Sequence, residues 1–208
     1  MIDYRIVALF VKAPTPGRVK TRLAKDIGDQ AACSIYRTLV ERVLQQIQAS
    51  GLALVLFFDG DETQIPDSWK QYARFCIQQQ GADLGERMAA ALSRLFSGGE
   101  QQAVVIGSDI PGINVAYLLQ SFDLLKEHPL VLGPALDGGY CLIGFNQSHF
   151  TESVFQNIPW SSDRVLELTL NAAAQAGLTV GLLPALRDID TVEDLRYLDP
   201  AVIRLTDG

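Results

Sequence analysis

Short apolar runs alternate with amphipathic helical patterns along this chain of 208 residues, and this alternation limits the possible folds more than any other feature. The runs are rich in Val, Ile, Leu and Phe, as expected of strands that are buried on both faces. They cover Arg5–Val11, Leu52–Phe58, Arg74–Gln79, Ala103–Gly107, Leu130–Ala135 and Leu178–Pro184. Helical periodicity predicts helices at Asp29–Ala49, Leu84–Phe96, Val115–Lys126 and Asp163–Ala176.

Strands that alternate with helices predict a mostly parallel, twisted sheet with helices on both faces, which is a three-layer α/β/α arrangement. The segment Asp137–Phe145 departs from this rhythm, because a Gly pair precedes an alternating run. It predicts a turn into an additional, antiparallel strand. No repeat, linker or low-complexity segment interrupts the chain, so we expect residues 1–208 to form a single domain.

Composition narrows the class of partner. A net charge of −7 argues against a nucleic-acid partner, because proteins that bind nucleic acids usually present a basic face to the phosphates. The three cysteines are scattered without a Cys-x-x-Cys spacing, which predicts neither a disulfide framework nor a zinc site and fits the cytoplasm. No apolar run is long enough for a membrane span.

A basic loop follows the first expected strand. Its cations precede the first acidic residue of the loop, and they are Lys12, Arg18, Lys20, Arg22 and Lys25. The spacing excludes both the Walker A loop and the dinucleotide fingerprint. A turn at Pro16 and Gly17 that exposes backbone N–H groups, with Lys20 and Arg22 as cations, predicts a polyphosphate site, to which Lys12 and Arg18 would add. The alternative interpretation is a charged loop that only faces water.

Acidic residues follow two other expected strands. Ligands of open α/β sheets bind at the carboxyl ends of the strands. Asp109 lies at such an end, where it suits a hard cation such as Mg²⁺, although it can instead cap a turn or the helix near Asn114. Asp188 and Asp190 follow the last strand, just before a capping-box pattern that begins at Thr191. Two carboxylates that face a basic loop predict a site for a metal and a polyphosphate.

The segment Gln78–Met88 combines amides with glycines. Gly81 and Gly85 would let the backbone approach a flat ligand such as a nucleobase, which the amide of Gln79 or Gln80 would read. The alternative is an ordinary loop in which Asp83 caps the following helix.

Six motifs in this order resemble one family: FVKAPTPGRVKTRLA, QGADLGERM, GSDIPG, GPALDGGYCLIGF, PWSSDRVLELT and RDIDTVEDL. They look like the bacterial nucleotide-diphospho-sugar transferase family, long labelled as of unknown function and now regarded as glycosyltransferases, some linked to arsenosugar biosynthesis. The resemblance runs essentially from end to end and implies a GT-A type fold. More distantly, VKTRLA and GSDIP are similar to the phospholactate and molybdenum-cofactor guanylyltransferases.

The resemblance implies a nucleotide site at the first loop, a metal-binding acid at Asp109 and a second metal ligand near Asp190, with Asp188 as the other candidate. The metal would be Mg²⁺ or Mn²⁺. Further substrate contacts are expected from Ser108, Gly138, Gly139 and Tyr140. The chain departs from its distant relatives in two ways. It has APTPGRVKTR where sugar-nucleotide pyrophosphorylases carry a Gly-Gly-x-Gly-x-Arg loop, and Gly107-Ser108-Asp109 keeps only the final acid of the Asp-x-Asp motif that is common in glycosyltransferases of this fold.

We therefore expect a metal-dependent transferase with Asp109, Asp137 and Lys20 as its catalytic residues. The favoured reaction is glycosyl transfer from a nucleotide sugar to a small-molecule acceptor, with Asp137 as general base. The first alternative is a guanylyltransferase-like nucleotidyltransferase that uses a nucleoside triphosphate, because fold alone does not decide between the two reactions. The second alternative is a nucleotide-binding protein without catalysis.

Overall fold

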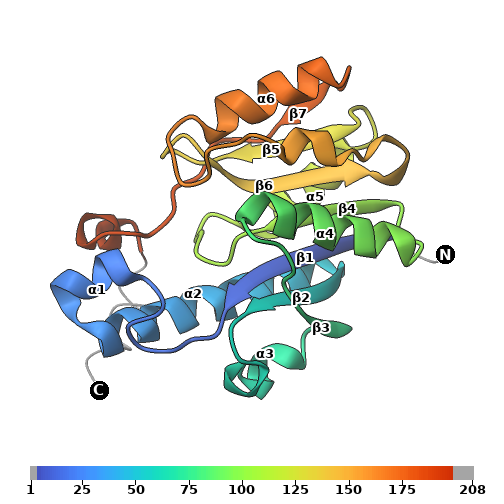
Figure 1. The fold of residues 1–208 in the computed structure, drawn as a ribbon. Helices are drawn as coiled ribbons and strands as arrows, with labels where there is room; N and C mark the ends of the chain where they lie inside the picture. Colours follow the sequence, from blue (N-terminus) through green and yellow to red (C-terminus); the bar gives the residue numbers. More distant parts are fainter. Residues whose placement is uncertain (1–3, 199–208) are drawn as a thin grey trace.

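A central sheet of seven strands organises the part of the chain that the structure describes, residues 4–198 of a computed structural model (Figure 1). The strand order is β3-β2-β1-β4-β6-β5-β7. The strands are β1 (Arg5–Lys12), β2 (Ala53–Asp59), β3 (Phe75–Gln78), β4 (Gln102–Ile106), β5 (Leu130–Pro134), β6 (Tyr140–Asn146) and β7 (Val180–Leu182).

Strand direction confirms the predicted pattern. β1 pairs in parallel with β2 and β4, β2 with β3, and β5 with β7. β6 runs antiparallel to both of its neighbours, β4 and β5, so the segment after the Gly pair is the additional strand that its alternation predicts. The carboxyl ends of β1, β2, β4 and β5 therefore meet at one edge of the sheet, together with the amino end of β6.

Helices cover both faces of the sheet, as predicted (Figure 1). α2 and α5 pack on one face, and α4 and α6 pack on the other. Within residues 4–198 the α-helices are α1 (Thr21–Ile27), α2 (Asp29–Ser50), α3 (Asp67–Lys70), α4 (Leu84–Ser97), α5 (Val115–Leu124) and α6 (Val165–Gln175). The 3₁₀ turns are η1 (Glu62–Gln64), η2 (Gln147–His149), η3 (Glu152–Phe155) and η4 (Val192–Tyr197). No helix of this described part combines the length and apolar character that crossing a membrane requires.

Two expectations about the elements are wrong. β3 and β7 are not buried on both faces, because they are the two edge strands of the sheet; Phe75 of β3 is 65% exposed and Leu182 of β7 is 52% exposed. The second half of the basic loop is not a loop, because Thr21–Ile27 forms α1. α1 packs through the buried Leu23 against α2 and the η4 segment, so an early and a late part of the described chain lie side by side at the carboxyl edge of the sheet (Figure 1).

Candidate active site

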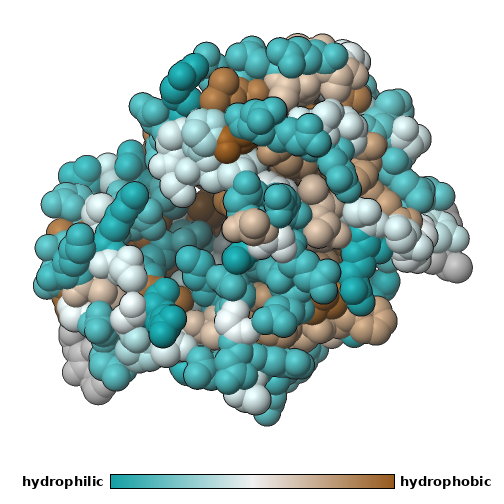
Figure 2. Space-filling model, in the orientation of Figure 1, coloured by the Kyte–Doolittle hydropathy of each residue, from teal (hydrophilic) through white to brown (hydrophobic). Residues whose placement is uncertain are grey.

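Two adjoining pockets lie at the carboxyl edge of the sheet. The larger, here called the polar pocket, has a volume of about 560 Å³ and lies between the basic loop, the ends of β1, β2 and β4, and the start of α4. The smaller, here called the acidic pocket, has a volume of about 250 Å³ and lies between β4, β6 and the loop that precedes α6. Both share Phe10, Leu84, Gly107, Asp109 and Ser161 as wall residues. Figure 2 shows a hollow on this face with hydrophilic residues around its rim and hydrophobic colour in its depth.

Lys20 joins the two predicted metal ligands. Its Nζ lies 2.5 Å from Asp109 Oδ2 and 3.0 Å from Asp190 Oδ1, and its side chain is only 3% exposed. Burial by itself would lower the pKa of Lys20, but the attraction of the two carboxylates outweighs it, and the pKa lies above its ordinary value. The predicted convergence of Asp109 and Asp190 beside the basic loop is confirmed. The two acids lie 89 and 170 positions after Lys20 along the chain.

The backbone holds Lys20 in an unusual conformation. It stands at the N-cap position of α1 with φ 48° and ψ 43°, the left-handed region that residues other than Gly seldom occupy. Such residues cost on the order of 1 kcal/mol or more and persist where the surroundings fix them, often at functional sites. At Lys20, the contacts of its buried ammonium group with Asp109 and Asp190 hold the backbone in this conformation.

The other members of the basic loop separate into two groups. Lys12 and Arg22 line the polar pocket, and Arg22 Nη1 lies 3.4 Å from Asp190 Oδ2 at the exposed rim. Pro16, Gly17 and Arg18 do not line it, contrary to expectation. Gly17 adopts φ +76° where an added Cβ would lie 3.1 Å from the carboxylate of Asp29, so the Pro-Gly turn packs beside the start of α2.

Asp109 is free of the capping role that the sequence left open. Asn114 caps α5 instead, because its side chain accepts a hydrogen bond from the N–H of Tyr117 at 3.0 Å. The neighbouring Ser108 is buried, and its hydroxyl lies 3.4 Å from the hydroxyl of Tyr36. Tyr36 also accepts a hydrogen bond from Lys12 N at 2.7 Å, so one α2 side chain ties the end of β1 to the end of β4.

The side chain of Asp190 likewise does not cap the following 3₁₀ turn. The capping box at the start of η4 is formed by Thr191 and Asp194, as predicted. Asp194 Oδ2 accepts hydrogen bonds from Thr191 N at 3.0 Å and from Asp190 N at 3.2 Å. The carboxylate of Asp190 is therefore left for Lys20 and Arg22, while Asp188, two residues earlier, lines the acidic pocket.

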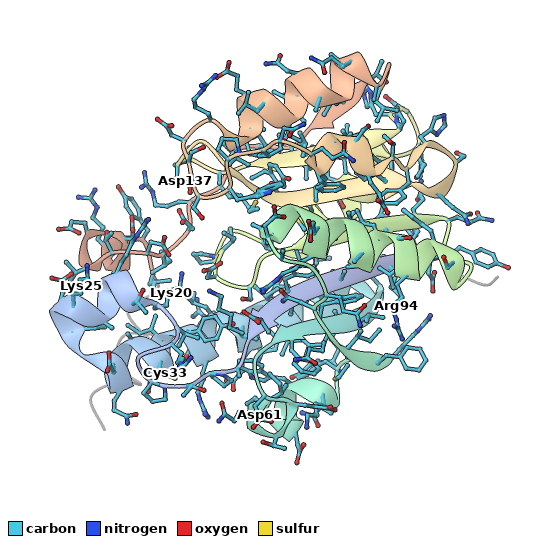
Figure 3. All side chains as sticks on the ribbon, in the orientation of Figure 1. Lys20, Lys25, Cys33, Asp61, Arg94 and Asp137 are labelled. Atoms are coloured by element: carbon cyan, nitrogen blue, oxygen red, sulfur yellow. The ribbon has the colours of Figure 1, made fainter. Side chains whose placement is uncertain are left out.

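The charged side chains of the described chain that line the acidic pocket are all carboxylates. Asp109, Asp137 and Asp188 line it, and no Lys, Arg or His from residues 4–198 does. Burial raises the pKa of Asp188 above its ordinary value, with further contributions from Asp190 and Asp137. Asp137 is exposed, and its Oδ1 accepts a hydrogen bond from Gly139 N at 2.9 Å, which forms the turn into β6. Figure 3 shows Asp137 and Lys20 on segments above and below this part of the edge.

Aromatic groups complete the acidic pocket. Tyr140 and Trp160 meet edge to face with ring centroids 6.3 Å apart. The Tyr140 hydroxyl and the Trp160 Nε1 are buried without a hydrogen-bond partner, and burial raises the pKa of Tyr140. Gly139 lines the pocket as expected, whereas Gly138 packs against the backbone of Asp163, where an added Cβ would clash.

The placement of the glycine and amide motif needs correction. Gln80, Gly81 and Gly85 line neither pocket. Gly85 makes room for the ring of Trp160, which an added Cβ would approach to 2.4 Å. Gln79 lines the polar pocket instead, and its Nε2 donates hydrogen bonds to the carbonyls of Phe57 at 3.0 Å and Val11 at 3.3 Å. The alternative role of Asp83 is confirmed, because its side chain caps α4.

An ion pair that the sequence analysis missed lies in the polar pocket. Arg87 Nη1, from α4, lies 3.2 Å from Asp59 Oδ2, at the end of β2. Asp59 follows a strand as Asp109 does, so the same argument from strand ends would have found it. No sequence pattern predicts Arg87 at this site, because only the packing of α4 on the sheet brings its side chain to the polar pocket.

A sheet of this order with a pocket at its carboxyl edge defines the nucleotide-diphospho-sugar transferase class of α/β fold. The sequence profile of one bacterial family matches residues 42–162. The chain belongs to this family, which is described as an uncharacterized protein conserved in bacteria (DUF2064). No curated protein sequence matches it.

Solved structures similar to this chain include one at substantial sequence identity. A protein of Desulfovibrio desulfuricans G20, provisionally named a nucleotide-diphospho-sugar transferase, is 32% identical over 100% of both chains, with a TM-score of 0.88. The 4-diphosphocytidyl-2C-methyl-D-erythritol synthase of Anaerococcus prevotii shares 10% identity over 96% of this chain and 99% of its own, with a TM-score of 0.64. A cytidylyltransferase of Leptospira borgpetersenii shares 13% identity over 98% and 94%, with a TM-score of 0.60. The chain is thus similar over nearly its whole length to nucleotide-utilising transferases.

Proposed function

We propose that this protein is a metal-dependent glycosyltransferase that moves a sugar from a nucleotide sugar to the hydroxyl group of a small acceptor. The observation that carries the proposal is the charge of the acidic pocket. It adjoins the polar pocket at Asp109 and contains three carboxylates but no cationic residue from the described chain. Carboxylates accept hydrogen bonds from sugar hydroxyls and repel a phosphate.

The polar pocket suits the nucleotide part of the donor. Lys12, Lys20 and Arg22 supply positive charge for a diphosphate, in a chain that is otherwise acidic. The nucleoside would lie toward the ends of β2 and β3, where Asp59 and Gln79 supply polar groups. The acidic pocket, which is smaller than a typical site for a drug-sized ligand, then suits a single sugar ring and the reacting hydroxyl.

Asp109 and Asp190 fit a magnesium or manganese ion. The described residues contain no group of three or more acidic, His or Cys side chains arranged for a metal. However, Mg²⁺ typically uses only one or two carboxylates, with phosphate oxygens and water as its remaining ligands. These two carboxylates already converge on one cation, the ammonium group of Lys20. A bound ion would neutralise charge on the departing diphosphate.

The chain's own residues then account for the transfer. The acceptor oxygen forms a bond to the anomeric carbon, the bond from that carbon to the phosphate oxygen breaks, and a nucleoside diphosphate leaves. Lys20 and Arg22 hold the departing phosphates. Asp137 takes the proton of the acceptor hydroxyl, because its second carboxylate oxygen remains available beside the turn bond to Gly139.

Nucleotidyl transfer is the second candidate, and the cationic side of the polar pocket favours it. In that reaction the phosphate of an acceptor attacks the α-phosphorus of a triphosphate, and pyrophosphate leaves. The test is product analysis with magnesium and a panel of nucleotide sugars and nucleoside triphosphates. Release of nucleoside diphosphate from a sugar donor supports glycosyl transfer, and release of pyrophosphate supports nucleotidyl transfer. Nucleotide binding without any product would identify a non-catalytic binding protein.

A further inference from the structure

The position of the Lys20 ammonium group bears on how a metal and a nucleotide enter the site. Lys20 Nζ contacts Asp109 Oδ2 at 2.5 Å and Asp190 Oδ1 at 3.0 Å. The proposed function assigns these same two carboxylates to the metal ion. The ammonium group and a divalent ion therefore compete for the same two carboxylates.

In the free protein, burial and backbone conformation hold the Lys20 ammonium group between the two carboxylates. The side chain is 3% exposed, whereas the carboxylates of Asp109 and Asp190 are about one-third exposed, at 34% and 36%. The backbone of Lys20 is in the left-handed region at the start of α1, a conformation that persists only where the surroundings fix it. A solvated loop lysine would have neither the burial nor the constrained backbone.

We propose that Lys20 is a resident cation, which occupies the metal position of the free protein and gives it up only to a polyphosphate. A divalent ion that arrives alone would sit beside an ammonium group and experience its repulsion. An incoming polyphosphate supplies the negative charge that draws Lys20 away from the two carboxylates. Metal and polyphosphate then bind together, and neither binds tightly alone. This inference rests on the metal site of the proposed function and adds its order of binding.

The test is a titration of the purified full chain with Mn²⁺ in the absence of any nucleotide, followed through the electron paramagnetic resonance signal of the free ion. Lys20→Gln removes the charge, and we expect it to bind Mn²⁺ on the order of tenfold more tightly than the parent protein, because one like charge has left the site. Lys20→Gly is the second variant, because Gly adopts the left-handed backbone without strain and so keeps the test possible should the Gln variant fail to fold.

Two further variants locate the effect. Arg22→Gln is the matched control: it removes a cation that contacts Asp190 from the exposed rim, and it is expected to change Mn²⁺ affinity far less. The double variant Lys20→Gln with Asp109→Asn should lose the gained affinity. Equal Mn²⁺ affinity of the parent and both Lys20 variants overturns the inference, and so does a gain that survives in the double variant.

A second measurement uses inorganic triphosphate as the probe. In equilibrium dialysis the parent protein should retain Mn²⁺ and triphosphate together, in amounts that neither reaches alone. Independent retention of each would overturn the inference. Because both experiments measure binding and not bond breaking, their outcome is separate from that of the product analysis.

Discussion

The polar pocket and the acidic pocket share a wall at Asp109 but differ in how their charge is organised. In the polar pocket most acids contact a cation: Asp109 and Asp190 contact Lys20, and Asp59 contacts Arg87, while Asp83 caps α4. In the acidic pocket the carboxylates of Asp137 and Asp188 have no such partner among its lining residues. Balanced charge suits a ligand that brings its own metal and phosphates, whereas unbalanced acid suits an uncharged, hydroxyl-rich ligand. The contrast suggests that charge separates the nucleotide half of the proposed donor from its sugar half, with Asp109 at the boundary.

The largest effect is expected at the shared wall. Asp109→Ala should lower the transfer rate by about 10³-fold, as loss of a preorganised electrostatic group at a reacting centre does. It should also abolish metal-dependent nucleotide binding, measured by calorimetry with and without magnesium. Asp123→Asn is the control, because Asp123 is an exposed acid paired with Lys126 on α5. Unchanged metal-dependent binding in a folded Asp109→Ala protein would contradict the proposed role.

The acidic pocket is tested next by Asp137→Asn. The amide keeps an oxygen that accepts the hydrogen bond from Gly139 N, so the turn is preserved while the base is removed. We expect kcat to fall by about 10²-fold, the low end for loss of a general base. Nucleotide affinity should be unchanged. A comparable loss of nucleotide affinity would show that Asp137 contributes to nucleotide binding in the polar pocket, and it would contradict the division of roles between the two pockets.

The cations of the basic loop are tested by a matched pair of substitutions. Lys20→Ala should weaken binding of a nucleoside diphosphate, without divalent ions, by about tenfold or more, since charge-assisted hydrogen bonds are worth roughly 1.5–3 kcal/mol. Arg18→Ala removes a cation from the same loop that lies outside the pocket, and it should leave the affinity unchanged. The plain nucleoside should bind equally to all three proteins. Equal losses for nucleoside and nucleoside diphosphate would indicate a folding role for Lys20.

The smallest effect concerns stability. The pKa of Asp188 is raised above 3.8 in the folded protein, chiefly by burial, so its ionised form opposes folding at neutral pH. The contribution of the protonated Asp188 carboxyl group to the free energy of unfolding is fully present below the pKa of Asp188 in the unfolded chain. It is lost as the pH rises through the higher pKa of Asp188 in the folded protein. Asp188→Asn should therefore raise Tm at pH 7, by about 1–2 °C given solvent screening and the size of the chain.

The measurement is a thermal melt across the acid range. The gain from Asp188→Asn should shrink toward zero as the pH falls below the unfolded pKa. Asp137→Asn provides the comparison, because its exposed side chain should leave Tm nearly unchanged at every pH. A constant difference between the parent and Asp188→Asn would assign the effect to packing instead of charge.

The sequence predicted most of the fold and part of the site. Asp109, Asp190 and Asp137 were placed correctly at one edge because the carboxyl ends of parallel strands converge there. The sequence does not decide between Gln79 and Gln80, because a one-residue difference in strand register turns a side chain to the other face, and the apolar pattern of β3 does not fix the register. Arg87 and the Gly85–Trp160 contact depend on packing between segments distant along the chain, which local patterns do not contain.

The antiparallel strand β6 makes the two pockets inseparable. It lies between β4 and β5 and pairs with both, so a chain that ended before Tyr140 would leave an unpaired sheet edge in the middle of the domain. Under the proposed function, the donor side and the acceptor side are therefore built on one continuous sheet. Variation in acceptor range would then be expected in the loops that border the acidic pocket, at residues 135–139 and 160–162, because they lie outside the strands.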